Sequence, residues 1–175
     1  MTTPTGREVF FDRDDLIVSK TNLKGHITYA NDIFCDIAGY TEADVIGQPH
    51  NMIRHPDMPR CVFKLLWDTI QAGAEIFAYV VNMAKNGDHY WVLAHVTPSY
   101  DANGSIIGYH STRRVPNPQT IQNIIAPLYR DLVKIEESHA NRKDGMEASH
   151  QKLVEILAEK NLRYDEFVAD LAKAA

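Results

Sequence analysis

The chain has 175 residues, of which 45% are hydrophobic and 23% charged, a composition typical of a folded globular protein and not of a disordered one. The formal net charge is −5 and the basic residues are spread along the sequence, so we expect no nucleic-acid partner. No window approaches the roughly 20 apolar residues of a membrane helix, and the N-terminus lacks the pattern of a signal peptide. The sequence therefore predicts a cytosolic protein without membrane insertion, in which the two cysteines are free buried thiols.

The first elements predicted along the chain are a β-hairpin and a short helix. Two apolar runs at residues 16–21 and 26–30 flank the turn-forming segment 22–25, an arrangement typical of paired strands. Asn31 or Asp32 is then placed to cap a helix whose apolar residues share one face. A proline-containing irregular stretch follows.

A longer helix and three strands come next. Apolar residues recur at helical spacing from residue 60 to 72. The three strands are expected at residues 76–83, 90–100 and 106–114. Both connections between them contain Asn-Gly, at Asn86-Gly87 and Asn103-Gly104, which is a strong hairpin signal. Strand blocks separated by a helical block favour an antiparallel α+β domain, with helices on one sheet face and a cleft between helix and sheet.

The composition divides the chain into three parts. Residues 1–14 are expected to be an N-terminal tail or cap, residues 15–116 the α+β domain, and residues 117–175 a C-terminal extension of amphipathic helices. Pro127 is expected to kink or split the first of these helices. The polar run from Glu136 to Gly145 is interpreted as a surface section or a break.

Several segments carry a resemblance to a known family. The sequence from Ile27 to Asp32 and Ala38-Gly39-Tyr40-Thr41 resembles the opening of a PAS sensory domain. The runs Gly47 to Pro59 and Lys85 to Val92 are similar to the PAS domain of bacterial aerotaxis receptors, as is Pro127-Leu128-Tyr129. The resemblance covers roughly residues 15–133. One segment, Glu75 to Val81, departs from the family pattern, so we expect a remodelled pocket wall there.

The resemblance implies a PAS fold, with a five-stranded antiparallel sheet and short helices on one face. It also implies non-covalent binding of FAD and a response to redox or oxygen status. Carried over by position, the expected cofactor-binding residues are Asn31, Arg54, His55, Asp57, Trp67, Asn82, Tyr90 and Trp91. Arg54 suits a phosphate and Asp57 a hydroxyl or amide of the ligand. By spacing alone, Arg54 and Asp57 are also compatible with a salt bridge in a loop, and His55 with a helix cap.

Other functions remain open from the residues. A buried histidine among the eight could ligate haem b in a gas or redox sensor. Alternatively, the domain is a cofactor-free module for interaction or dimerisation. The sequence has no HExxH zinc pattern, nucleophile elbow, Walker loop or Rossmann fingerprint, so we expect neither a metal site nor an enzyme.

The interpretation favoured by these patterns is a cytosolic FAD-binding sensor that signals through rearrangement of helices or of a partner. The apolar stripe from Ile121 to Ile135 would dock on the sheet or on a second chain. We expect a homodimer and a separate downstream signalling protein.

Overall fold

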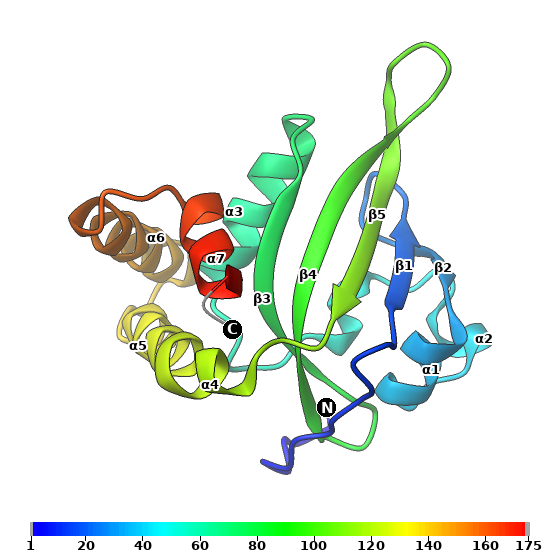
Figure 1. Cartoon of the computed structure of the whole chain (residues 1–175), viewed down its shortest axis with the longest axis horizontal. Helices are drawn as coiled ribbons and strands as arrows, with labels where there is room; N and C mark the ends of the chain where they lie inside the picture. Colours follow the sequence, from blue (N-terminus) through cyan, green and yellow to red (C-terminus); the bar gives the residue numbers. More distant parts are fainter. Residues whose placement is uncertain (1, 174–175) are drawn as a thin grey trace.

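The computed structural model describes residues 2–173 and contains a five-stranded sheet (Figure 1). Its strands are β1 (Ile17–Thr21), β2 (Ile27–Ala30), β3 (Ile76–Met83), β4 (His89–Tyr100) and β5 (Ile106–Arg114). They are arranged in the order β2-β1-β5-β4-β3, and every neighbouring pair is antiparallel. The predicted α+β architecture, with an antiparallel sheet of five strands, is confirmed.

Short helices and one longer helix connect the two strand blocks. They are α1 (Asp32–Ala38), α2 (Glu42–Val45), the 3₁₀ turn η1 (His50–Ile53) and α3 (Arg60–Gln71). Asn31 caps α1 as predicted, because its side chain accepts a hydrogen bond from the Phe34 amide. In Figure 1, α3 lies beside β3 and partly behind it, and its apolar side chains Val62, Leu66 and Ile70 are buried.

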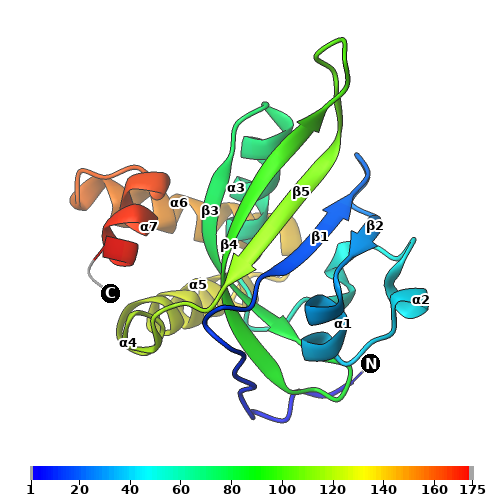
Figure 2. The ribbon, with the colours of Figure 1, turned by 45° about the vertical axis from the view of Figure 1, so that its right-hand side comes forward.

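Alternation along the strands separates the two faces of the sheet. Tyr109, Ser111 and Arg113 of β5 point toward α3, as do Ala94 and Val96 of β4, because they line the same cavity. Residues at the intervening positions therefore point to the opposite face. The β4–β5 hairpin extends beyond the other strands (Figure 2).

The C-terminal part of the chain is helical. Its elements are α4 (Pro118–Thr120), the π-turn η2 (Ile121–Ile125), α5 (Ala126–Glu137), α6 (Arg142–Glu159) and α7 (Tyr164–Lys173). Pro127 lies at the start of α5. A proline lacks the amide proton of a regular helix and collides with the preceding turn, and the wider π-turn accommodates both effects. The predicted irregularity at Pro127 is thus present.

The C-terminal helices lie apart from α3, which covers the cavity face of the sheet. α5–α7 gather at the β3 edge of the sheet (Figure 1), and Tyr129 of α5 packs on Trp91, on the face opposite the cavity. The break predicted in the polar run from Glu136 to Gly145 is present, but both end residues of the run are buried and not at the surface. Only residues 138–141 interrupt the helices, and a Cβ on Gly145 would lie 2.4 Å from the Glu136 carbonyl oxygen. The polar run therefore contains a tight helix crossing.

The N-terminal segment packs along the turn between β3 and β4. The Thr5 amide donates to the Gly87 carbonyl and the Val9 amide to the His89 carbonyl, at 2.9 and 2.7 Å. Arg7 forms an ion pair with Asp88. This segment therefore adds a cap to the end of the sheet nearest α1. None of the described helices is long and apolar enough to cross a membrane.

Candidate functional site

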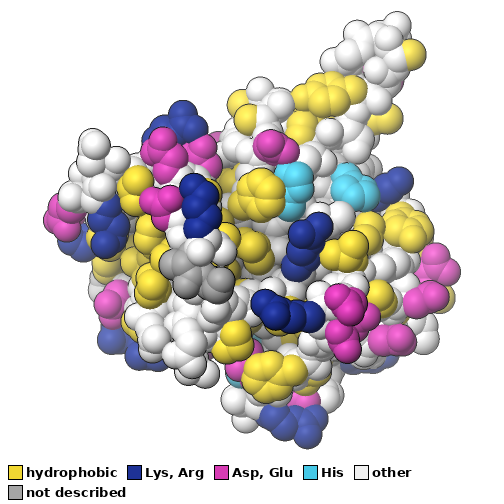
Figure 3. Space-filling view, viewed as in Figure 1, with side chains coloured by type: hydrophobic (Ala, Val, Ile, Leu, Met, Phe, Trp, Pro, Cys, Tyr) yellow, Lys and Arg dark blue, Asp and Glu magenta, His cyan; other side chains and the backbone are white. Residues whose placement is uncertain are grey.

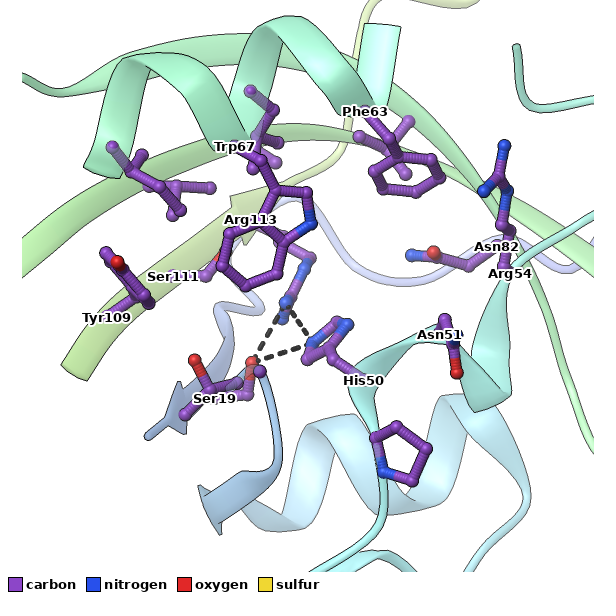
Figure 4. A pocket seen from close by; sticks show the side chains of 18 of the residues that line it. Ser19, His50, Asn51, Arg54, Phe63, Trp67, Asn82, Tyr109, Ser111 and Arg113 are labelled. Carbon is purple, nitrogen blue, oxygen red and sulfur yellow. Dashed lines mark hydrogen bonds between the residues drawn. The ribbon is translucent and has the colours of Figure 1, made fainter. Parts of the chain in front are cut away.

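A cavity of about 390 Å³ lies between the sheet, α3 and η1 (Figure 4). This volume falls within the range of small-molecule and cofactor sites, roughly 300–1,000 Å³. The residues that line it all come from the region between β1 and β5, so the C-terminal helices do not contribute to its walls. The cavity is the cleft between helix and sheet that the element order predicted.

Aromatic side chains of α3 form one wall of the cavity. Trp67 meets Tyr109 of β5 edge to face, with ring centroids 5.5 Å apart. One turn earlier in α3, Phe63 carries the guanidinium of Arg54 over its ring at 4.5 Å. Aliphatic residues Leu66 and Ile70 add to the same wall. The wall therefore offers flat apolar surfaces suited to a planar ring.

The opposite wall carries a buried polar cluster of Ser19, His50 and Arg113. The Arg113 Nη2 donates to Ser19 Oγ at 2.9 Å and to His50 Nε2 at 2.7 Å (Figure 4). Burial, followed by the charge of Arg113, lowers the pKa of His50 to about 3, so this ring is neutral at pH 7. Burial lowers the pKa of Arg113 to about 10, which leaves the guanidinium charged.

Three polar atoms in the cavity wall have no hydrogen-bond partner among the described residues. They are Nδ2 of Asn82, Oγ of Ser111 and Nη1 of Arg113. An unpaired buried donor costs roughly 1–3 kcal/mol, and native structures seldom retain such groups unless a function or a bound molecule accounts for them. A ligand with several acceptor atoms would satisfy them.

The cavity is also electrostatically one-sided. Within the described residues, its lining contains Lys24, Arg54 and Arg113 but no aspartate or glutamate. Burial lowers the pKa of Arg54, while the charge of Glu136 acts in the opposite direction. A neutral or anionic ligand therefore fits this lining better than a cation.

Three of the eight site residues predicted from the sequence line the cavity: Arg54, Trp67 and Asn82. An isolated bridge joins Arg54 to Asn82, which brings the loop and β3 together at one end of the cavity. The Arg54 guanidinium also donates to the Met58 carbonyl at 3.0 Å, so it is held in place by its own loop.

Three predicted residues outside the lining have local structural roles. The Asn31 side chain accepts from the Val18 and Phe34 amides and donates to the Leu16 carbonyl. His55 is buried against His89, with ring centroids 5.5 Å apart, and its Nδ1 accepts from the Asp57 amide. The Asp57 side chain is 78% exposed. None of these three side chains belongs to the cavity lining, so their contact with a cofactor stays a prediction.

The remaining two predicted residues are separated by strand alternation. Tyr90 is buried on the cavity side of β4 but does not line the cavity, and burial raises the pKa of its hydroxyl. Trp91 points to the opposite face and packs on Tyr129 at 5.9 Å between centroids. The two adjacent aromatics therefore cannot face one ligand.

The segment from Glu75 to Val81 contributes one residue, Val80, to the cavity lining. Tyr79, the preceding residue of β3, points to the other face, so its side chain does not line the cavity. Its backbone carbonyl oxygen accepts a hydrogen bond from the Tyr129 hydroxyl of α5 at 2.6 Å.

The sequence patterns did not identify Ser19, His50, Ser111 or Arg113 as site residues. Strand period contained a signal for part of this cluster, because Tyr109, Ser111 and Arg113 alternate along β5 and an arginine on a buried face is rare. Convergence of His50 with Ser19 depends on the path of η1 across β1, which no local pattern encodes.

With this geometry established, comparison with known proteins places the chain in a family. The family model described as the PAS fold matches residues 27–113, which run from β2 through β5. These residues belong to the PAS fold family, and the five-stranded sheet with its helical wall is a PAS domain.

Curated relatives include the aerotaxis receptor of Escherichia coli (strain K12), 44% identical over 68% of this chain and 23% of the receptor. The nitrogen fixation regulatory protein of Klebsiella pneumoniae is 26% identical over 59% of this chain and 21% of that protein. The chain thus spans less than a quarter of the length of either. A solved light-oxygen-voltage domain, from a study of a flavin analogue, superposes with a TM-score of 0.56 at 15% identity, covering 66% of this chain and 87% of that one.

Among residues 2–173, no three His, Cys, Asp or Glu side chains converge in a way that could hold a metal ion.

Proposed function

We propose that the PAS domain binds FAD in the cavity beneath α3 and reports redox or oxygen status through its C-terminal helices. The observation that supports this proposal best is the match between the chemistry of the cavity lining and that of a flavin ring. A planar aromatic wall at Trp67 faces unpartnered polar atoms of Asn82, Ser111 and Arg113, and a flavin ring has apolar faces and an edge of carbonyl and nitrogen acceptors. The 44% identity to the aerotaxis receptor supports the same assignment.

The charge of the cavity supports a nucleotide cofactor. Lys24 and Arg54 add positive charge to the lining, and guanidinium and ammonium groups are the usual partners of phosphate oxygens. Lys24 is exposed to solvent in the β1–β2 turn, where it can reach a diphosphate that leaves the enclosed part of the cavity.

The cavity histidine favours flavin over haem. The Arg113 Nη2 can only donate, so the neutral His50 accepts through Nε2 and carries its proton on Nδ1. Neither ring nitrogen then has a lone pair free for iron. His55, although buried, does not line the cavity.

The C-terminal helices are joined to the cavity helix by one buried carboxylate. Glu136 of α5 accepts hydrogen bonds from the Arg60 and Cys61 amides at the start of α3, both at 3.0 Å. Ser149 of α6 donates to the same carboxylate at 2.9 Å. Because α3 carries Trp67, a ligand that shifts α3 changes the contacts of α5 and α6. This rearrangement of α5 and α6 would change the contacts within the expected homodimer or with a downstream signalling protein.

The test is the visible spectrum of the purified protein, followed by identification of the released cofactor. We expect the two-banded absorption of a flavin and close to one FAD per chain after supplementation. A Soret band would assign haem in its place. Protein that is folded by circular dichroism and stays colourless with added FAD contradicts the proposal and supports an interaction module.

A further inference from the structure

The guanidinium of Arg113 is a buried positive charge that has no carboxylate partner within residues 2–173. The residue is 4% exposed. Its Nη2 bonds to two neutral groups, Ser19 and His50, while Nη1 has no partner among the described residues. Another close neighbour is the ring of Phe34, 5.8 Å away. Buried charges are normally paired, because desolvation is otherwise costly.

We propose that Arg113 is the anion acceptor of the cavity and that its Nη1 side receives the electron-rich edge of the ligand. The inference rests on the proposed flavin function and adds to it the residue that sets the charge preference of the site. The cavity then binds a negatively charged form of the ligand more tightly than a neutral form.

Ser19 and His50 position this guanidinium. Both accept from Nη2 (Figure 4) and lie 3.1 Å from each other, so they fix one side of the group. Nη1 stays without a partner among the described residues, in a side chain that lines the cavity. A neutral imidazole is required for this contact, because a protonated His50 would place a second positive charge beside Arg113. Burial first, and then the charge of Arg113, lower the pKa of His50 and keep the ring neutral.

A bound flavin supplies a ring that accepts two electrons and one proton at neutral pH and so gains one negative charge. An acceptor that prefers the charged form stabilises that form by its differential affinity. Arg113 therefore raises the midpoint potential of a bound flavin above that of the same site without the positive charge. The redox signal and the ligand preference of the cavity then depend on one side chain.

The experiment compares Arg113→Met and Arg113→Lys with Arg114→Met in the full chain. Arg114 is the matched control, since it is exposed and lies one residue along β5 on the opposite face. Charge-assisted hydrogen bonds contribute enough that we expect R113M to raise the Kd for FAD by about tenfold to a hundredfold. R113K should fall between R113M and the wild type, and R114M should equal the wild type.

The stability of the FAD-free protein separates a binding role from a structural one. Removing an uncompensated buried charge relieves its desolvation, and Ser19 can still donate to His50 Nε2. We therefore expect FAD-free R113M to melt at or above the temperature of the FAD-free wild type, although it binds FAD less well. A structural role predicts that R113M loses both stability and binding, and this result would overturn the inference.

The potential of bound flavin gives a second readout, measured with dithionite against a reference dye. We expect a lower midpoint potential in R113M than in the wild type and R114M. Equal potentials and equal Kd values in the three proteins contradict the role of Arg113 while leaving FAD binding intact. A colourless wild type contradicts the proposed function itself, so the two failures are distinguishable.

Discussion

At the scale of single residues, Gly25 determines how far Trp67 extends into the cavity. Gly25 has a φ of +78°, and a Cβ at this position would lie 3.0 Å from Cη2 and 3.1 Å from Cζ2 of Trp67. Contacts this short require the indole to move, and the cavity is the open space beside it. The β1–β2 turn therefore sets the position of the aromatic wall.

We predict that Gly25→Ala weakens FAD binding severalfold and also lowers the free energy of unfolding. Placing a side chain in the left-handed region costs roughly 1–2 kcal/mol, and displacing Trp67 narrows the site. Gly104→Ala is the matched control, because Gly104 has a φ of +80° and no described atom would lie within 4 Å of a Cβ added there. Urea denaturation and FAD titration of both variants should show similar losses of stability but a loss of affinity in G25A alone. Equal affinities would contradict a role for Gly25 in shaping the cavity.

Residue identity predicted part of the site, and the predicted side chains outside the cavity lining include one that is bonded to nearby backbone groups. Arg54, Trp67 and Asn82 line the cavity as expected. Asn31 instead satisfies amides in its own helix cap and in β1, and the cap was also predicted from the sequence. Both roles were compatible with the sequence, because the direction of a short polar side chain depends on which backbone amides lie within its reach.

At the scale of elements, α3 depends on a residue of α5 for its N-terminal cap. Pro59 precedes α3 and makes no side-chain capping bond within the described chain, so the first amides of the helix need another acceptor. Glu136 supplies it to Arg60 and Cys61 and receives the Ser149 hydroxyl. A carboxylate at this end also interacts favourably with the helix dipole.

We predict that Glu136→Gln lowers the free energy of unfolding by about 2 kcal/mol, within the range of hydrogen bonds to charged groups. The amide retains one acceptor oxygen, but its NH₂ group would face one of the two backbone donors. Glu137→Gln is the control, since Glu137 is exposed on the same helix. The measurement is the urea midpoint of each variant at constant m-value. Identical midpoints for E136Q and the wild type would show that the cap does not stabilise the fold.

Elements with strong local signals were predicted closely, and contacts between distant elements were not. Asn-Gly turns at Asn86 and Asn103 and the alternation along the strands indicated the β3–β5 meander, which the structure contains. The polar run from Glu136 to Gly145 predicted the break between α5 and α6, but not the burial of Glu136 and Gly145 at its two ends. The burial of Glu136 accompanies its pairing with an amide 75 residues away in the sequence, which periodicity does not encode.

At the scale of the whole molecule, the cavity and the C-terminal helices form one connected unit. Phe63 and Trp67 place α3 against the ligand site, and the same helix begins at the Glu136 carboxylate. On the face seen in Figure 3, charged side chains of both signs are interspersed with hydrophobic ones. Because α3 lines the cavity and its first amides bind the Glu136 carboxylate, we expect a shift of α3 caused by a ligand to reach α5 and α6 through this buried contact.

Thermodynamic linkage relates FAD binding in the cavity to the docking of α5 and α6 on α3. If docking of α5 and α6 favours the ligand-bound position of α3, FAD must stabilise that docking by the same factor. We expect FAD to slow hydrogen–deuterium exchange in Arg142–Glu159 of the wild type, and to slow it much less in E136Q. The Kd of E136Q for FAD should rise by the same factor by which FAD stabilises the docked helices in the wild type. E137Q should behave as the wild type. Equal protection by FAD in E136Q and the wild type would mean that the helices respond through contacts other than the Glu136 carboxylate.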